Sequence, residues 1–155
     1  MHELLLLRHA EALPAQAGHD RDRHLSPHGQ SQARAVGDWL AGLALRPEQV
    51  LCSDTRRTRT TAALALAPFT PAPPITFLTS IYDATPGELL ALLARHEQAG
   101  RVLLVGHNPG VSGLLVALCP DLPAGTAMAP ATVAHIILTG PIAPGQGHLK
   151  ASLSS

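Results

Sequence analysis

The sequence contains few aromatic residues, few cysteines and no hydrophobic run long enough to cross a membrane. Aromatic residues make up 3% of the 155 residues, and the two cysteines, Cys52 and Cys119, lie outside any Cys-x-x-Cys pair. The leucine run Leu4–Leu7 is only four residues long, whereas a membrane helix needs about 20 apolar residues and a secretory signal needs a longer apolar segment behind a basic start. We therefore expect a soluble, cytoplasmic protein with no disulfide framework and no membrane partner.

An excess of charge of either sign is also absent. Eleven basic and eleven acidic side chains give a formal net charge of zero, so there is no electrostatic reason to expect nucleic acid as a partner. Hydrophobic residues account for 46% of the chain, which is enough to bury a core built from Leu, Ala and Val. The length predicts a single domain over residues 1–155.

Short apolar segments without polar alternation predict strands that are buried on both faces, as in a parallel sheet. The predicted strands are Leu4–Leu7, Gln49–Ser53, Ile75–Leu78, 101–107 and 132–140, followed by a weak strand at the C-terminus.

Helix signals separate the first four of these strands. Ser26 and Pro27 predict the cap and first turn of a helix that continues to about Leu45. Ser53 predicts the cap of a second helix, which must end before Pro68.

Two further helices are predicted in the second half of the chain. Thr85–Glu88 has the capping-box pattern, and Gly100 is expected to end the helix that follows. Asn108–Pro109 predicts the start of a fourth helix, which ends at Cys119. The alternation of strands and helices predicts an α/β fold with a mostly parallel sheet and helices on both faces.

Basic side chains gather where the predicted strands end. Arg8 and His9 follow the first strand. Arg57 lies about one turn beyond Ser53, at the end of the second strand, and His107 ends the fourth strand just before a helix. Ligands bind beyond the carboxyl ends of strands in such sheets, so we expect these basic groups to converge without a carboxylate partner. Guanidinium forks suit a phosphate dianion, and a histidine among cations stays neutral and nucleophilic.

Three motifs in this order resemble the histidine phosphatase superfamily, the phosphoglycerate mutase-like proteins. They are "LLLLRHAEA", "CSDTRRTRTTA" with Ser53, Arg57 and Thr61, and "LLVGHNPG". The segment "HLSPHGQSQA" also resembles the family pattern, so the resemblance spans residues 4 to 113. The short length, "SIYDATPGELL" and "VGHNPG" resemble the SixA-type branch, the phosphohistidine phosphatases.

The resemblance implies a phosphoglycerate mutase-like fold without a cap domain. It also implies that His9 is the nucleophile and becomes transiently phosphorylated, while Arg8, Arg57 and His107 bind the phosphoryl oxygens. Neither a metal ion nor another cofactor is implied.

The substrate is indicated by a departure from the superfamily pattern. Many members carry a glutamate that protonates an alcohol leaving group, but Ser80 stands about where it would fall, and Glu88 is explained by the capping box. Imidazole leaves more easily than an alkoxide, so the sequence favours phosphohistidine on a protein as substrate. Two alternatives stay open: a small phosphoester with Asp83 supplying the proton, and a non-catalytic phosphate-binding module.

Other charged clusters and glycines have simpler explanations. Arg56 and Arg59 are expected to be surface or substrate-facing charges. A metal site in the segment "HDRDRHLSPH" is disfavoured because two arginines interrupt it and the spacing fits no ligand pattern. Its candidate ligands are His19, Asp20, Asp22, His24 and His28. The glycines of "GHNPGVSG" do not form the GxGxxG fingerprint of a nucleotide site.

Overall fold

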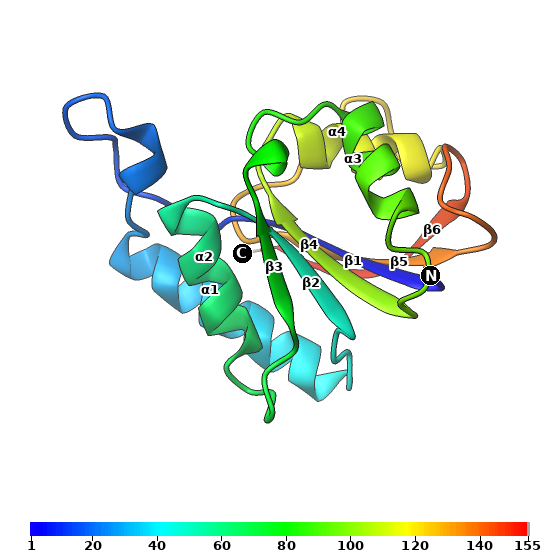
Figure 1. The fold of residues 1–155 in the computed structure, drawn as a ribbon, viewed down its shortest axis with the longest axis horizontal. Coiled ribbons are helices and arrows are strands. Elements are labelled where there is room, and N and C mark those ends of the chain that lie inside the picture. The colour runs from blue at the N-terminus through cyan, green and yellow to red at the C-terminus, as the bar shows by residue number, and fades with distance from the viewer. Residues whose placement is uncertain (155) are drawn as a thin grey trace.

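A six-stranded sheet lies between two layers of helices in the computed structural model, which describes residues 1–154 (Figure 1). The strands are β1 (Glu3–Arg8), β2 (Gln49–Ser53), β3 (Ile75–Leu78), β4 (Arg101–Gly106), β5 (Val133–Leu138) and β6 (Gly147–Leu153). The helices are α1 (Pro27–Gly42), α2 (Arg56–Leu66), α3 (Pro86–Ala94) and α4 (Gly110–Leu118), with 3₁₀ turns η1 (Asp20–Asp22) and η2 (Thr79–Ile81). The α/β prediction is confirmed.

The strand order is β3-β2-β4-β1-β5-β6. The strands β1, β2, β3 and β4 pair in parallel, as expected, whereas β5 runs antiparallel to β1 and to β6. The parallel part of the sheet therefore brings the carboxyl ends of β1, β2 and β4 to one edge.

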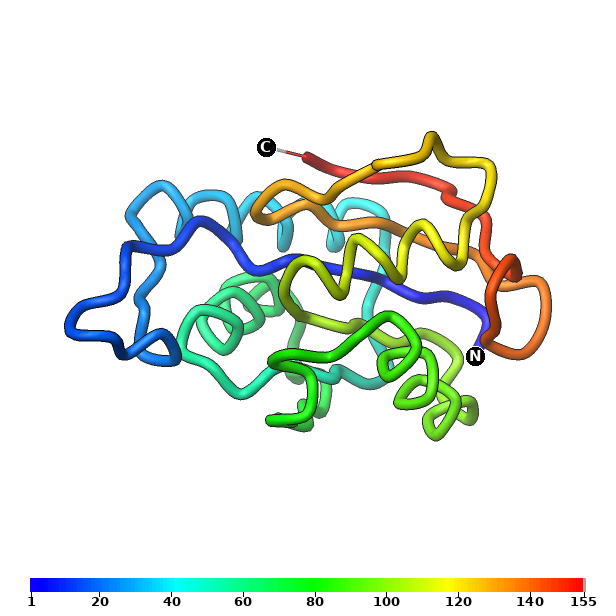
Figure 2. Tube along the Cα trace, turned by 90° about the horizontal axis from the view of Figure 1, so that it is seen from above, coloured from blue at the N-terminus to red at the C-terminus, as the bar shows by residue number. Residues whose placement is uncertain are grey.

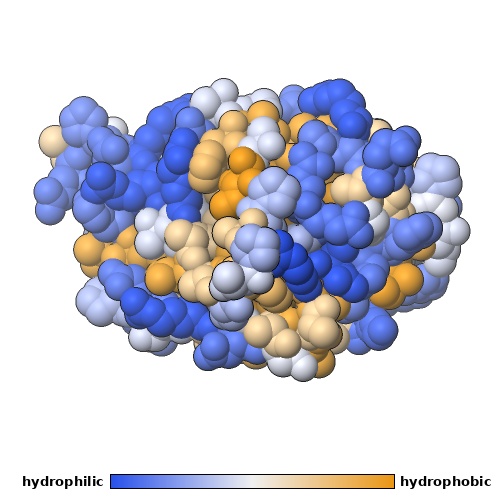
Figure 3. Space-filling view, turned by 60° about the horizontal axis from the view of Figure 1, so that its bottom comes forward, coloured by the Kyte–Doolittle hydropathy of each residue, from blue (hydrophilic) through white to orange (hydrophobic). Residues whose placement is uncertain are grey.

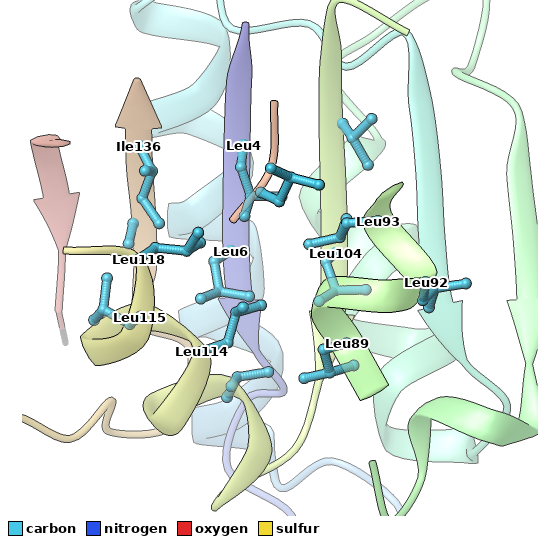
Figure 4. Close-up of a cluster of buried hydrophobic side chains, with 14 of the residues drawn as sticks. Leu4, Leu6, Leu89, Leu92, Leu93, Leu104, Leu114, Leu115, Leu118 and Ile136 are labelled. Carbon is cyan, nitrogen blue, oxygen red and sulfur yellow. The ribbon is translucent and has the colours of Figure 1, made fainter. Parts of the chain in front are cut away.

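The leucine run of β1 supplies both hydrophobic cores. Leu4 and Leu6 pack with residues of α3 and α4 (Figure 4), and Leu5 and Leu7 pack with residues of α1 and α2. All four side chains are fully buried, because successive residues of a strand point to opposite faces and both faces of this sheet are covered. The strand that carries Arg8 is therefore fixed from both sides.

Two helix starts follow the sequence signals closely. The Ser26 side chain accepts a hydrogen bond from the Gly29 backbone N–H at 2.9 Å, with Pro27 in the first turn of α1. At α3, Thr85 and Glu88 form the predicted capping box.

Two predicted caps are wrong. Ser53 is the last residue of β2, and Thr55 caps α2 instead, because its backbone is still extended while its side chain accepts from the Thr58 N–H. Asn108 does not cap α4: its side chain accepts from Ser112 and donates to the Met128 carbonyl group.

Two helices also end earlier than predicted. The helix α1 stops at Gly42 rather than Leu45. The helix α3 stops at Ala94 rather than Gly100, because the Arg95 N–H turns back to the carbonyl groups of Leu92 and Leu93.

The segment between β1 and α1 projects from one end of the molecule in two perpendicular views (Figures 1 and 2). On the face in Figure 3 this projecting end is mostly hydrophilic, whereas apolar side chains elsewhere lie in patches between polar ones. Within residues 1–154, no helix combines the length and the apolar character needed to cross a membrane.

The base of this projecting segment packs tightly on α1. A Cβ atom at Gly29 would overlap the backbone carbonyl oxygen of Glu11, which also accepts the Ser26 N–H at 3.0 Å. We expect Gly29→Ala to lower the free energy of unfolding by about 2–4 kcal/mol, because neither backbone can shift without breaking this contact. Chemical denaturation measures the change.

Gly42→Ala is the matched control, since it lies at the other end of the same helix and a Cβ atom there would meet no atom within 4 Å. This variant is expected to be neutral or slightly stabilising. Equal losses of stability in the two variants would contradict the steric explanation.

Candidate active site

Residues from three strand ends meet at the carboxyl edge of the sheet. His9 directly follows β1, and His107 directly follows β4, which pairs with both β1 and β2. The two imidazole rings lie 5.3 Å apart between centroids. Arg57, in the first turn of α2, has its Nη2 atom 3.4 Å from Nδ1 of His107. Arg8 ends β1 beside them, with Nη1 donating to the Met128 carbonyl oxygen at 3.0 Å.

His9 is buried, and its hydrogen bond fixes the tautomer of the ring. Nδ1 lies 2.8 Å from the carbonyl oxygen of Ala10. A carbonyl oxygen can only accept, so Nδ1 carries the proton and Nε2 keeps its lone pair. Thr61 reinforces this arrangement, because its hydroxyl accepts from the Ala10 N–H at 3.0 Å and donates to the Arg57 carbonyl group at 2.7 Å.

Both imidazoles are neutral at pH 7. The pKa of His9 is lowered to about 4, chiefly by burial and also by the Arg57 and Arg8 charges, against the hydrogen bond to Ala10. Burial and the Arg57 charge lower the pKa of His107 to about 3. A neutral imidazole with a free ring nitrogen is the nucleophilic form of histidine.

The second ring nitrogen of His107 contacts β2. Its Nε2 lies 2.7 Å from the Ser53 hydroxyl, and Arg57 directs an N–H at Nδ1. This explains why Ser53 belongs to the motif although it does not cap α2: its hydroxyl orients the imidazole at the end of the neighbouring strand.

The guanidinium groups of Arg8 and Arg57 each have a buried N–H that donates no hydrogen bond. Among residues 1–154, buried side-chain nitrogen or oxygen atoms without a hydrogen-bond partner occur at Nε of Arg8, Arg57 and Arg101. Arg101 begins β4 and lies at the opposite end of the sheet, so the other two mark this edge. A buried N–H without an acceptor is costly, and an oxyanion would supply acceptors for both.

Asp20 contradicts the expectation that these cations have no carboxylate partner. Its Oδ2 atom accepts from Nη2 of Arg57 at 3.1 Å, and its carbonyl oxygen accepts from Nη1 at 2.7 Å. The Tyr82 hydroxyl also donates to Oδ2. Chiefly through this Tyr82 hydrogen bond, and also through Arg57, the pKa of Asp20 is lowered to about 2.

Sequence reasoning missed both Asp20 and Tyr82. Asp20 is 37 residues from Arg57 in the chain and belongs to no motif. The available signal was the charged "HDRDRH" segment, which we considered only as a metal site.

The other predicted charges are engaged elsewhere. Arg59 pairs with Asp54 at 2.7 Å, and Arg56 lies 2.5 Å from Nε2 of His24. Glu11 accepts from the Ser26 hydroxyl at 2.9 Å.

The region predicted to lack a general acid forms one wall of a cavity. Asp83 is exposed and lines a cavity of about 360 Å³ together with Tyr82 and His107. Ser80 is exposed and lines a different pocket. Of the described residues, no three or more His, Cys, Asp or Glu side chains are arranged to hold a metal ion.

Comparison with known proteins identifies the family. The family model of the histidine phosphatase superfamily (branch 1) matches residues 4–80. An uncharacterized protein from Mycobacterium tuberculosis is 32% identical over 113 residues, which are 72% of this chain and 69% of that protein. The chain belongs to the histidine phosphatase superfamily.

Solved structures of this superfamily place the chain in the SixA type. A protein provisionally assigned as the phosphohistidine phosphatase SixA of Agrobacterium tumefaciens superposes with a TM-score of 0.87 at 28% identity, over 99% of this chain and 98% of that one. The protein histidine phosphatase SixA complexed with tungstate has the same fold, with a TM-score of 0.85 at 24% identity over 98% and 96% of the two chains. The predicted phosphoglycerate mutase-like fold is confirmed, and the chain is a phosphatase of this superfamily.

The lowered pKa values make the stability of this histidine phosphatase depend on pH. In the unfolded chain His9 and His107 have pKa values near 6.5, well above the folded values of about 4 and about 3. Their contribution to stability is therefore complete above about pH 6.5 and is lost as the pH falls toward 4, because the unfolded chain then binds more protons. We expect each histidine to add at most about 1.4 kcal/mol per pH unit to the slope of the free energy of unfolding against pH.

Urea denaturation at several pH values between 4.5 and 8 measures this slope. His9→Gln should make it shallower, whereas His148→Gln, which changes an exposed histidine on β6, should leave it unchanged. An identical slope in wild type and His9→Gln would show that His9 titrates normally in the folded chain.

Proposed function

We propose that this chain is a phosphohistidine phosphatase that acts on a phosphorylated protein through a phosphorylated His9. The observation that carries the proposal is the buried pair of unpartnered guanidinium Nε–H groups beside a neutral imidazole. The guanidiniums provide donors and positive charge for a phosphoryl dianion, and the imidazole provides the attacking lone pair. Arg8, Arg57 and His107 are the proposed phosphate-binding residues.

In the first step, Nε2 of His9 attacks phosphorus. A new P–N bond forms to His9 while the P–N bond of the substrate breaks, and its electron pair goes to the leaving imidazole, which takes a proton from water. Charge on the phosphoryl oxygens is stabilised by Arg8 and Arg57. The bound dianion also favours protonation of His107, whose Nδ1 then no longer accepts from Arg57 and donates to a phosphoryl oxygen instead.

In the second step, water attacks the phosphorus of phosphorylated His9. The P–N bond to Nε2 breaks, its electron pair returns to the imidazole, and inorganic phosphate leaves. The two guanidiniums supply the positive charge throughout, so the proposed reaction requires no metal ion or other cofactor. Turnover is therefore expected to persist in EDTA.

The leaving group supports a phosphohistidine substrate. Asp20, with a pKa of about 2, is ionised and paired with Arg57, so it does not supply a proton. Ser80 stands about where the superfamily glutamate would fall in the sequence, and it lines a different pocket from His107. An imidazole leaving group needs less protonation than an alkoxide, so this site fits phosphohistidine better than an ordinary phosphoester.

Asp83 supports a second candidate, a phosphomonoesterase for small molecules. Its carboxyl group is exposed in the cavity that also contacts His107, so it could protonate an alcohol bound there. A phosphate-binding module without turnover fits less well, because binding alone needs no free nucleophile at Nε2 of His9.

Parallel assays test these functions. Wild type and Asp83→Asn are given a phosphohistidine-bearing carrier protein and a panel of small phosphomonoesters, and phosphate release is measured. The proposal predicts turnover of the carrier by both proteins, and alkaline quenching followed by mass spectrometry should find phosphate on His9. Turnover of phosphomonoesters alone, lost in Asp83→Asn, favours the second candidate. Phosphate binding without turnover or trapped phosphate contradicts both enzymatic functions.

A further inference from the structure

Arg57 is held by a single residue of the projecting segment. The terminal nitrogens of its guanidinium donate to Asp20 twice, from Nη1 to the backbone carbonyl oxygen at 2.7 Å and from Nη2 to Oδ2 at 3.1 Å. An arginine head group has many rotamers, and two bonds to one rigid partner fix both its position and its plane.

Asp20 is itself fixed from several sides. The Tyr82 hydroxyl donates to the same Oδ2 atom that Arg57 contacts, and Arg23 lies 3.4 Å from Oδ1. The Tyr82 ring in turn lies 5.4 Å from the His107 ring and 4.2 Å from the guanidinium carbon of Arg21, centroid distances that indicate contact. The turn η1 is thereby tied to the residue that follows η2, 62 positions further along the chain.

These bonds leave one side of the guanidinium available. Asp20 accepts one hydrogen bond from Nη1 and one from Nη2, and Nδ1 of His107 also lies near Nη2. The Nε atom has no partner among the described residues. The carboxylate therefore orients Arg57 without using the Nε–H that a phosphoryl oxygen would need.

We propose that Asp20, anchored by Tyr82, is the positioning residue that holds Arg57 in the geometry for binding the phosphoryl group. This inference rests on the proposed function. It assigns to the projecting segment a task that the motifs do not contain: η1 supplies the acceptors that orient a cation carried by α2. The opposite role, a carboxylate that competes with the substrate for Arg57, predicts the opposite response to its removal.

A set of variants separates these roles. Asp20→Ala removes the side-chain acceptor and is expected to lower kcat by about 10–100-fold, since small displacements of a positioning group cost this much. Asp20→Asn keeps an acceptor of the same shape and should restore kcat to within about 5-fold of wild type. Tyr82→Phe removes one hydrogen bond to Oδ2, and its kcat should lie between those of Asp20→Asn and Asp20→Ala. Asp22→Ala, in the same turn but outside the Arg57 contacts, should match wild type.

The variant Asp20→Ala is also combined with Arg57→Ala. A residue that acts through Arg57 adds no further loss once Arg57 is gone. Calorimetry with inorganic phosphate provides a readout without turnover, and its Kd is expected to rise about 10-fold in Asp20→Ala and not in Asp22→Ala. Thermal unfolding shows whether each variant is folded at the assay temperature.

The inference is overturned if folded Asp20→Ala keeps wild-type kcat and phosphate affinity. It is overturned as well if Asp20→Ala lowers kcat by the same factor in the Arg57→Ala background as in wild type. It is also overturned if Asp20→Ala binds phosphate more tightly or turns over faster, which is the result for a competing carboxylate. Failure of the proposed function is distinct, because wild type would then bind phosphate with no turnover of any phosphorylated substrate.

Discussion

Replacing His9 with alanine is expected to lower kcat for phosphorylated substrates by at least about 10³-fold, because the variant has no ring nitrogen to attack phosphorus. The geometry makes the loss specific. His9 directs Nδ1 at the Ala10 carbonyl group and leaves Nε2 free, and the low pKa keeps it unprotonated at pH 7. Steady-state phosphate release measures the effect.

The matched control is His148→Ala, which removes an exposed histidine from β6. This control should retain wild-type turnover. In His9→Ala the affinity for inorganic phosphate should stay within about 5-fold of wild type, since both guanidiniums are still present. Undiminished turnover by His9→Ala would remove this histidine from the nucleophilic role.

Replacing Arg57 is expected to have the next largest effect. Arg57→Ala should lower kcat/KM by about 10³-fold, because it removes a buried cation that would face the charge developing on the phosphoryl oxygens. Arg57→Lys should lower it by about 10²-fold, because an ammonium restores the charge but not the planar fork that Asp20 holds.

The chain offers two controls on the same helix. Arg56 and Arg59 flank this site on α2, but they contact His24 and Asp54 at the surface. Their alanine variants should retain kcat/KM within about 3-fold, as expected for surface charges. A larger loss of kcat/KM in Arg59→Ala than in Arg57→Ala would contradict the assignment, because it would mean that Arg59 and not Arg57 binds the phosphoryl group.

The layered fold could be predicted because its signals are local. The apolar run Leu4–Leu7 indicated a strand buried on both faces, and the capping box Thr85–Glu88 indicated a helix start. Both are present, because hydrophobic burial and capping act within one element. The direction of β5 was not predictable in the same way, since antiparallel pairing with β1 depends on how the chain returns from α4.

The site was predictable where motif and strand end coincide. His9 and His107 each follow a strand, so the parallel pairing of β1 with β4 is sufficient to bring them together. Asp20 and Tyr82 lie outside the strand ends, and their contact with Arg57 depends on the path of a 3₁₀ turn that carries no hydrophobic pattern. Ser53 was wrongly predicted to cap α2 for a related reason. Its hydroxyl contacts His107, 54 residues away, rather than the start of the nearby helix.

The leucines of β1 alternate between the two cores, and this alternation determines the face of the sheet on which each later residue of the strand lies. Because Leu4 and Leu6 enter one core and Leu5 and Leu7 the other, a deletion of one leucine would turn the whole run over. It would also exchange the sides from which the guanidinium of Arg8 and the imidazole of His9 approach the sheet edge. This segment should therefore accept isoleucine or valine in place of leucine far more readily than any odd-numbered change in length.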